Sequence, residues 1–292
     1  MAGTGSARGL EKGAVLAGRL LAAVAGDQDG GGCTAGVVPA GVGAAVGLFE
    51  SVRYRLDPIV ARMVGAVQVE VPLAEGVHDL DAMAAAITPR TRAVFLCEPN
   101  NPTGTAELEW FLDRVPGDVL VVLDEAYFEF YRSPGAPDGV ALHHERPNLL
   151  ALRTFSKAYG LAGLRVGYGV AQPVIAEALR KCAVPCGVGR IAEEAALAAL
   201  RVETEPFERV ERIVAERERT RAALLGLGWE VLPSETHFLW LPTGEAESVA
   251  AQWERRGLLV RAFPGSGLRV TLSSPDANDL LITAKETAPP AR

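Results

Sequence analysis

The sequence predicts an α/β fold, with a mainly parallel sheet sandwiched by helices and a smaller α+β domain at the C-terminus. Two observations support this prediction. Between residues 66 and 182, short apolar runs alternate with segments of helical periodicity, as βαβ units require. After residue 228, three strand-like segments occur together with a helical stretch. We therefore expect a large domain over residues 1–205 and a long helix with a small domain over residues 206–292.

In the large domain, strands and helices are expected to alternate along the chain. The expected strands are short and rich in apolar residues, and they cover residues 66–71, 93–97, 119–123, 149–152 and 166–170. The expected helices carry helical periodicity, a capping residue or an initial proline, and they cover residues 79–87, residues 107–115 and a segment that begins at Pro173. In this architecture ligands bind at the carboxyl ends of the strands.

The small domain is expected to follow one long helix over residues 206–225. This segment is rich in both Glu and Arg, and because the opposite charges nearly cancel, it is interpreted as a solvated helix face. Three strands are then expected, over residues 237–241, 258–263 and 268–272. The domain boundary is predicted near residues 205–228.

One segment of the large domain fits neither a helix nor a strand. Residues 30–49 contain many glycines, no charged residue and no regular apolar period. We expect an irregular Gly-rich loop there.

The composition excludes several classes of protein. The chain has 292 residues, of which 49% are hydrophobic and 22% charged, so disordered and collagen-like proteins are excluded. The formal net charge of −7 gives no bias toward nucleic acid or anionic lipid and favours a small-molecule partner.

The cysteines and the apolar segments predict a protein of the cytoplasm. Four cysteines in a chain of this length are too sparse for a disulfide framework and suit a reducing compartment. Cys182 and Cys186 have no histidines nearby and do not indicate a metal site, so none is expected. The apolar stretch over residues 14–25 is too short to span a membrane.

Polar side chains with distinct chemistry follow successive strands. The first strand end leads into a Pro-rich and Gly-rich turn that contains Asn101, and the second leads into Asp124 and Tyr127. A carboxylate at the end of a buried strand is costly unless a cation or a strong donor meets it. A third strand end is followed by two hydroxyl groups and Lys157, and Arg165 comes shortly after.

Each of these features alone has a structural explanation, such as a turn, a helix cap or a surface ion pair. Together they match the needs of a planar, phosphorylated, electron-accepting aldehyde. A lysine can form a Schiff base with it, a carboxylate can keep its ring nitrogen protonated, and hydroxyl groups with an arginine can hold its phosphate.

Four motifs resemble those of the fold type I pyridoxal-phosphate aminotransferases, in the group of histidinol-phosphate and aromatic aminotransferases. They are PNNPTG at 99–104, DEAY at 124–127, TFSKAYGLAGLRVGY at 154–168 and LVRAFPGSGLRVTL at 259–272. Their order and spacing also match, and the resemblance covers about residues 58–272. It implies the large and small domains of that fold and a class I/II aminotransferase.

The resemblance also implies roles for individual residues toward pyridoxal 5′-phosphate and the substrate. Lys157 would form the Schiff base and move protons, Asp124 would pair with the ring nitrogen, and Asn101 and Tyr127 would hydrogen-bond the ring oxygen. The phosphate would be held by Thr154, Ser156 and Arg165. Arg269 would bind the substrate carboxylate as a bidentate fork, and Asn101 would also lie in the substrate site.

The N-terminal half matches the family less closely. Gly5, Ser6 and Ala7 resemble the glycine-rich loop whose backbone amides receive the cofactor phosphate. Tyr54 is a weak match to the aromatic residue that stacks on the cofactor ring. The family has an arm and a helix before the glycine-rich loop, and we expect the chain to be truncated there.

Near the C-terminus, His237 stands where relatives often have Asn in an SxANF pattern.

The resulting hypothesis is an aminotransferase with a ping-pong mechanism. It would move an amino group between an amino acid or histidinol phosphate, with an aromatic donor favoured, and a 2-oxo acid. The family implies a homodimer. Two alternatives stay open at this point, namely an inactive or weakly active relative without the N-terminal arm, and a related decarboxylase that uses the same cofactor.

Overall fold

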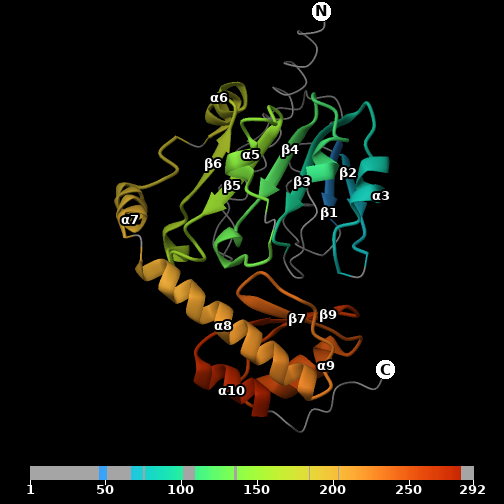
Figure 1. The fold of residues 1–292 in the computed structure, drawn as a ribbon, viewed down its shortest axis with the longest axis vertical. Coiled ribbons are helices and arrows are strands. Elements are labelled where there is room, and N and C mark those ends of the chain that lie inside the picture. The colour runs from blue at the N-terminus through green and yellow to red at the C-terminus, as the bar shows by residue number, and fades with distance from the viewer. Residues whose placement is uncertain are drawn as a thin grey trace, which may run out of the picture.

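The protein has two lobes, each built around its own β-sheet (Figure 1). The computed structural model describes residues 67–74, 76–100, 109–134, 137–183, 185–202 and 204–283, together with the backbone of residues 46–50. Helix α8 (Glu205–Gly226) runs alongside both lobes (Figure 1).

The larger lobe contains a six-stranded sheet in the order β2-β1-β3-β4-β5-β6. The strands are β1 (Val46–Glu50), β2 (Val67–Val71), β3 (Thr91–Cys97), β4 (Leu120–Asp124), β5 (Leu149–Thr154) and β6 (Gly167–Ala171). The neighbours from β2 to β5 pair in parallel, whereas β6 pairs antiparallel with β5. The predicted mainly parallel sheet is thus confirmed.

Helices connect these strands. They are α3 (Leu80–Ala85), α4 (Glu109–Leu112), α5 (Gly139–Leu142), α6 (Pro173–Cys182) and α7 (Arg190–Arg201), with short 3-10 helices at Phe128–Phe130 and Ala162–Leu164. Helix α3 begins where predicted, because the Asp79 carboxylate accepts a hydrogen bond from the Ala82 amide (2.9 Å). Helix α4 is shorter than predicted and ends at Leu112.

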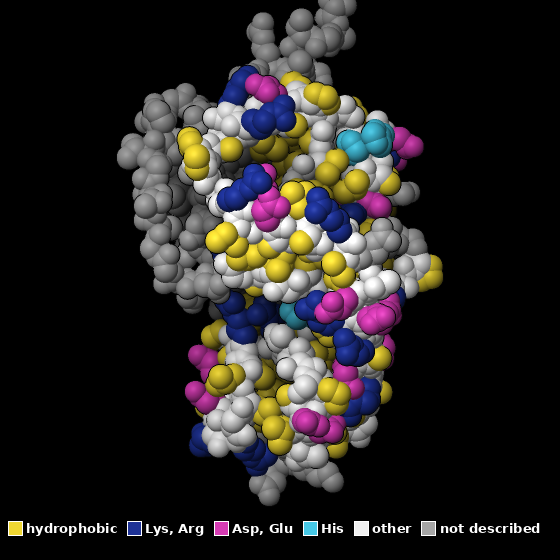
Figure 2. Space-filling view, turned by 90° about the vertical axis from the view of Figure 1, so that its left-hand side faces the viewer, with side chains coloured by type: hydrophobic (Ala, Val, Ile, Leu, Met, Phe, Trp, Pro, Cys, Tyr) yellow, Lys and Arg dark blue, Asp and Glu magenta, His cyan; other side chains and the backbone are white. Residues whose placement is uncertain are grey.

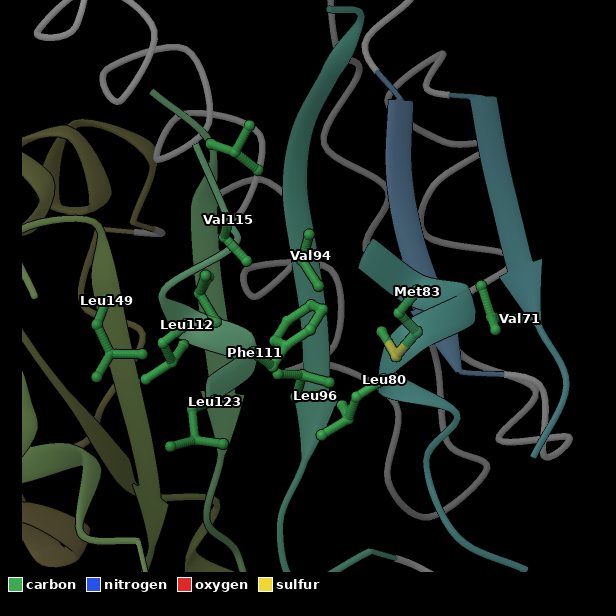
Figure 3. Packing of buried hydrophobic residues seen from close by; sticks show 12 residues of the cluster. Val71, Leu80, Met83, Val94, Leu96, Phe111, Leu112, Val115, Leu123 and Leu149 are labelled. Carbon is green, nitrogen blue, oxygen red and sulfur yellow. The ribbon is translucent and has the colours of Figure 1, made fainter. Parts of the chain in front are cut away.

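The core of the larger lobe lies between the sheet and helices α3 and α4. Met83, Phe111 and Leu96 are among the side chains that pack there (Figure 3). All four residues from Leu120 to Leu123 are buried, so both faces of β4 are covered by protein. This burial explains why β4 is a continuous apolar run rather than an alternating one.

The prediction of an irregular loop over residues 30–49 is wrong for its last four residues. Residues 46–49 belong to β1, which pairs in parallel with both β2 and β3 in the middle of the sheet. Pairing with strands that come later in the chain stabilises this segment, and the local sequence gives no sign of it. Residues 30–45 lie outside the described part of the chain.

The smaller lobe contains a three-stranded antiparallel sheet in the order β7-β9-β8. Its elements are β7 (Phe238–Pro242), α9 (Ala246–Glu254), β8 (Arg261–Phe263), β9 (Gly267–Thr271) and α10 (Pro275–Thr283). Strand β8 begins three residues later than predicted, because the Leu258 amide still donates to the Trp253 carbonyl (3.0 Å) at the end of α9. The exact division into residues 1–205 and 206–292 stays a prediction.

The two faces of the small sheet have different surroundings. Leu239, Leu241, Leu268 and Val270 point to one face and form the core of the lobe with α9 and α10. Trp240 and Arg269 form a cross-strand pair, so they share the opposite face.

Helix α7 is not predicted by the sequence analysis, and its outer side exposes large apolar side chains beside charged ones. Ile191 is 79% exposed and Leu200 is 52% exposed. Figure 2 shows hydrophobic side chains gathered on this side of the molecule, above the junction of the two lobes. Among the described helices, none combines the length and the apolar character needed to cross a membrane.

Candidate active site

Three neighbouring parallel strands end at the same edge of the larger sheet. Cys97 at the end of β3 pairs with Asp124 at the end of β4, and Asp124 pairs with Leu152 in β5, two residues before that strand ends at Thr154. The strands point toward the smaller lobe (Figure 1). The predicted side chains that follow these strands therefore face the junction between the lobes.

Asp124 lies at the bottom of this edge. Part of this residue is exposed to solvent. The protein atoms around the carboxyl group nevertheless displace much of its hydration, and this desolvation raises its pKa. The Ala126 amide, which donates to Asp124 Oδ1 (3.0 Å), and the charge of Lys157 lower the pKa to a smaller extent. Asp124 is therefore a carboxylate that a further cationic group would stabilise.

A tight turn after β5 brings two hydroxyl groups and Lys157 together. Thr154 Oγ1 donates to Ser156 Oγ (2.9 Å) and accepts from the Ser156 amide (3.1 Å). The Gly160 amide then donates to the Lys157 carbonyl (3.0 Å), and Gly160 has a positive φ of 71° that favours glycine. The turn fixes the backbone on both sides of Lys157.

A series of contacts links Lys157 to the smaller lobe. Lys157 Nζ lies 5.6 Å from the centroid of the Tyr127 ring. The Tyr127 ring meets that of Phe238 edge-on at 5.3 Å, and the Arg269 guanidinium carbon lies 5.2 Å from the Phe238 centroid. Lys157, Tyr127 and Arg269, which are far apart in the sequence, thus belong to one site.

His237 lies within this series. Burial, together with the positive charges of Lys157 and Arg269, lowers the pKa of His237 to about 3. The imidazole is therefore neutral at physiological pH.

The low pKa of His237 predicts that the cofactor-free protein loses stability in mild acid. Below pH 6.5, the unfolded chain binds a proton that the folded protein does not bind, so the free energy of unfolding falls. Between pH 7 and pH 5, we expect it to fall by about 2 kcal/mol more in the wild type than in His237→Asn. Urea unfolding at both pH values measures the difference, and an equal loss in the two proteins would contradict the prediction.

The remaining predicted site residues fall into two groups. Arg165 follows Lys157 with a left-handed φ of 52°, and its guanidinium donates to the Ala162 carbonyl (2.8 Å). Within the described residues, Arg165 forms no ion pair. The other predicted residues, Gly5, Ser6, Ala7, Tyr54 and Asn101, lie outside the described part of the chain.

Comparison with protein families identifies the chain. The family model described as aminotransferase class I and II matches residues 54–284. This range covers most of the chain and includes Asp124, Lys157 and Arg269. The chain belongs to the aminotransferase class I and II family.

Curated relatives and solved structures agree with this assignment. An aromatic amino acid aminotransferase of Streptomyces avermitilis is 56% identical over 239 residues, which cover 80% of this chain and 67% of the relative. A relative of the same name from Thermobifida fusca is 52% identical, over 81% of this chain and 67% of that protein. Histidinol-phosphate aminotransferase of Sinorhizobium meliloti, solved in complex with pyridoxal-5′-phosphate, is 30% identical with a TM-score of 0.74, over 84% of this chain and 70% of that one. The chain is therefore an aminotransferase, an enzyme that moves amino groups between amino acids and 2-oxo acids.

An ion network with the buried Glu125 at its centre follows directly after Asp124 in the aminotransferase. The Glu125 side chain accepts hydrogen bonds from the Gly139 amide (2.7 Å) and from Arg153 Nε (3.0 Å). Arg153 also pairs with Asp138 (2.7 Å) and stacks on the Phe128 ring, 3.7 Å from its centroid. Sequence reasoning missed this network, because its members come from three separate segments.

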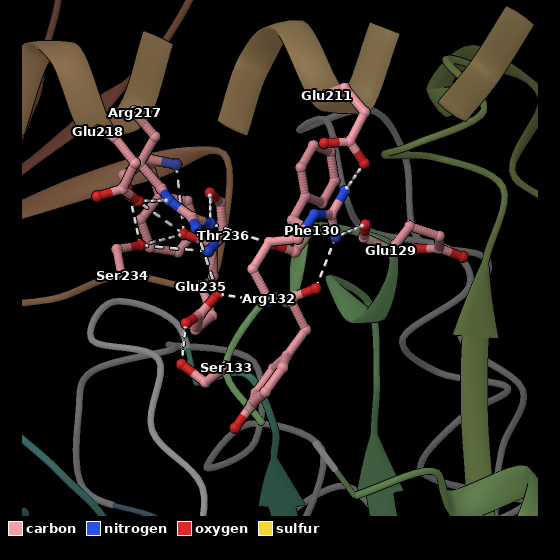
Figure 4. A network of polar contacts seen from close by, with 12 residues as sticks. Glu129, Phe130, Arg132, Ser133, Glu211, Arg217, Glu218, Ser234, Glu235 and Thr236 are labelled. Atoms are coloured by element: carbon pink, nitrogen blue, oxygen red, sulfur yellow. Dashed lines mark hydrogen bonds and ion pairs between the residues drawn. The ribbon is translucent and has the colours of Figure 1, made fainter. Parts of the chain in front are cut away.

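A second network joins the two lobes of the aminotransferase (Figure 4). Arg217 of α8 has a side chain only 3% exposed, and its Nη1 donates to the carbonyls of Phe130 (3.1 Å) and Thr236 (3.2 Å). Its other nitrogens pair with Glu218 (2.9 Å) and Glu235 (3.3 Å). The network fixes the segment after Asp124 against the segment before β7.

Proposed function

We propose that this aminotransferase binds pyridoxal 5′-phosphate at the carboxyl ends of β4 and β5 and transfers the amino group of an aromatic amino acid to a 2-oxo acid. The observation that carries the proposal is the arrangement of Asp124 and Lys157 at one edge of the sheet, with Arg269 linked to them from the smaller lobe through two aromatic rings.

The donor set of this edge suits the cofactor. Desolvation raises the pKa of the Asp124 carboxyl group. A protonated ring nitrogen beside the carboxylate would offset the cost of this desolvation. The hydroxyl groups of Thr154 and Ser156 lie together beside Lys157, as a phosphate site requires. Arg165, which follows this turn, forms no ion pair among the described residues and would supply the cation.

Residues outside the described part would complete the cofactor site. We propose that Asn101 hydrogen-bonds the ring oxygen together with Tyr127, and that Asn101 also borders the substrate. Tyr54 would stack on the ring, and Gly5, Ser6 and Ala7 would add backbone amides to the phosphate site.

The chemistry divides between the cofactor and the protein. When bound, pyridoxal 5′-phosphate accepts the electron pair that is left when a proton leaves the substrate α-carbon. The Lys157 amine would remove that proton from the α-carbon as a general base and deliver it to the C4′ carbon of the bound cofactor as a general acid. Asp124 holds the proton on the ring nitrogen, and Tyr127 orients the ring through its oxygen.

Arg269 positions the substrate for this proton transfer. Its guanidinium is half-buried on the sheet face opposite the small-lobe core, and its contact with Phe238 directs it to the Tyr127 side. A planar guanidinium binds a carboxylate through two parallel hydrogen bonds. We assign it the substrate α-carboxylate, so the α-carbon lies between Arg269 and Lys157.

The relatives support an aromatic donor. Eight curated relatives with 45–56% identity carry the name aromatic amino acid aminotransferase. A second candidate donor is histidinol phosphate, which the 30% identity to the Sinorhizobium meliloti structure favours.

A half-reaction screen tests the proposed function. Purified protein is loaded with pyridoxal 5′-phosphate and mixed with phenylalanine, tyrosine, histidinol phosphate or glutamate, and the carbonyl product is measured. We expect phenylalanine and tyrosine to react fastest. Release of carbon dioxide in place of an oxo acid would identify a decarboxylase, and no product from any donor would identify an inactive relative.

We further propose a homodimer that works in the cytoplasm. The exposed apolar side chains of α7, Ile191 and Leu200 among them, support an interface between copies. Four cysteines in a chain of 292 residues are too few for a disulfide framework and suit a reducing compartment. The mass of the protein in solution tests the dimer, and a mass of one chain would contradict it.

A further inference from the structure

His237 lies at the junction of the two lobes and has no role in the function proposed so far. It directly precedes β7, and its ring packs against two rings of the larger lobe. The ring centroids are 5.3 Å apart for Tyr127 and 5.5 Å apart for Phe130, with interplanar angles of 36° and 37°. Both partners belong to the segment that follows Asp124, so the imidazole borders the candidate site.

Two residues of the candidate site act on this imidazole through their charges. Each cation lies against a ring that packs on His237: Lys157 Nζ is 5.6 Å from the Tyr127 centroid, and the Arg269 guanidinium carbon is 5.2 Å from the centroid of Phe238, whose ring lies 5.5 Å from that of His237. Both charges lower the pKa of His237. Together with burial they keep the imidazole neutral, so one ring nitrogen carries a proton and the other a lone pair.

The two nitrogens of His237 differ in their surroundings. Nδ1 is buried and has no hydrogen-bond partner in the part of the chain that the structure describes. Nε2 is not among the buried unpartnered atoms of the described residues and the side chain is only half-buried, so Nε2 is the nitrogen that a bound molecule can reach. A buried N–H without an acceptor is costly, which favours the tautomer with the proton on Nε2.

We propose that His237 is a substrate-binding residue whose Nε2–H donates a hydrogen bond to the α-carboxylate held by Arg269. This inference rests on the proposed function, in which the substrate reaches from Lys157 at its α-carbon to Arg269 at its carboxylate. A substrate that reaches from Lys157 to Arg269 therefore lies beside the His237 imidazole. The carboxylate is the charged acceptor that such a molecule presents there.

Two substitutions separate the two features of this side chain. The His237 imidazole combines an N–H donor with a ring that packs on Tyr127 and Phe130. His237→Phe would keep the ring without a donor, whereas His237→Asn would keep a donor without the ring.

Binding of two unreactive probes to the cofactor-loaded enzyme tests the proposal. 3-Phenylpropanoate has a carboxylate but no amino group, and 3-phenylpropanamide has the same ring without the charge. We expect His237→Phe to weaken binding of the acid by about 10- to 100-fold, as for loss of a hydrogen bond to a charged group, and to weaken binding of the amide, whose neutral carbonyl accepts a weaker hydrogen bond, by only about 2- to 10-fold. His237→Asn should retain most of the affinity for the acid. The KM for phenylalanine should rise by a similar factor in His237→Phe, with a smaller change in kcat.

Several outcomes would overturn the proposal. For His237→Phe, they are an unchanged affinity for the acid, or an affinity that falls by the same factor for the acid and the amide. For the wild type, the contradicting outcome is an enzyme that transaminates phenylalanine but binds the acid and the amide with equal affinity. If His237→Phe does not fold, His237→Leu is measured in its place under the same criteria. Failure of the wild type to transaminate any donor would instead refute the proposed function, so the two failures are distinguishable.

Discussion

Replacing Lys157 with alanine is expected to abolish amino-group transfer. The amine would both react with the cofactor and move the substrate proton, and loss of a general base alone costs about 10²- to 10⁴-fold. Since both roles are lost, we expect a decrease of at least about 10⁴-fold in oxo acid formation. Product formation from phenylalanine by the loaded enzyme measures this loss.

A second lysine provides the matched control. Lys181 is exposed on α6, away from the strand ends, and Lys181→Ala should leave the rate unchanged. A small primary amine added to Lys157→Ala should restore part of the activity, because it can take the proton in place of the side chain. Transfer at a rate within tenfold of the wild type in Lys157→Ala would show that another residue performs the chemistry.

The strands that support this site could be predicted because their sequences are locally distinctive. Residues 119–123 are a run of branched apolar residues that suits a strand covered on both faces, and the structure contains β4 there. The same pattern placed Asp124 directly after the strand. Parallel pairing then brings Asp124 beside the end of β5. The location of the site at this edge of the sheet could therefore be predicted from the order of the strands and helices.

Strand β1 could not be predicted in the same way. Its residues, Val46–Glu50, follow a stretch of glycine and alanine with no period of its own. Its regular backbone depends on hydrogen bonds to β2 and β3, which come from later parts of the chain. Pairing of this kind is non-local, and a local pattern does not encode it.

The contacts of His237 likewise required the structure. The sequence marks it only as a departure from the asparagine that relatives often have. Its position between Lys157 and Arg269 depends on how the small sheet meets the segment after Asp124. The arrangement of the two lobes is determined by buried side chains, of which Arg217 makes the most extensive polar contacts.

Arg217→Leu is expected to lower the free energy of unfolding by about 3–5 kcal/mol. The substitution would remove the cationic partner of Glu235, which would keep the Arg132 amide and the Ser133 hydroxyl as donors. It would also leave the buried carbonyls of Phe130 and Thr236 without the Arg217 donor. Leucine would supply apolar packing, but it cannot satisfy these acceptors. Urea unfolding of the cofactor-free protein measures the loss.

Other substitutions on α8 separate this effect from the loss of a surface charge. Arg212 is exposed on the same helix, so Arg212→Leu should change the free energy of unfolding by less than about 0.5 kcal/mol. Arg217→Lys keeps the charge but lacks the planar guanidinium that reaches both carbonyls. Its decrease in the free energy of unfolding should therefore lie between those of Arg217→Leu and Arg212→Leu. Because Thr236 directly precedes His237, Arg217→Lys should also raise the KM for phenylalanine. If Arg217→Leu is no less stable than Arg212→Leu, the network does not hold the lobes together, and the position of His237 must depend on ring packing alone.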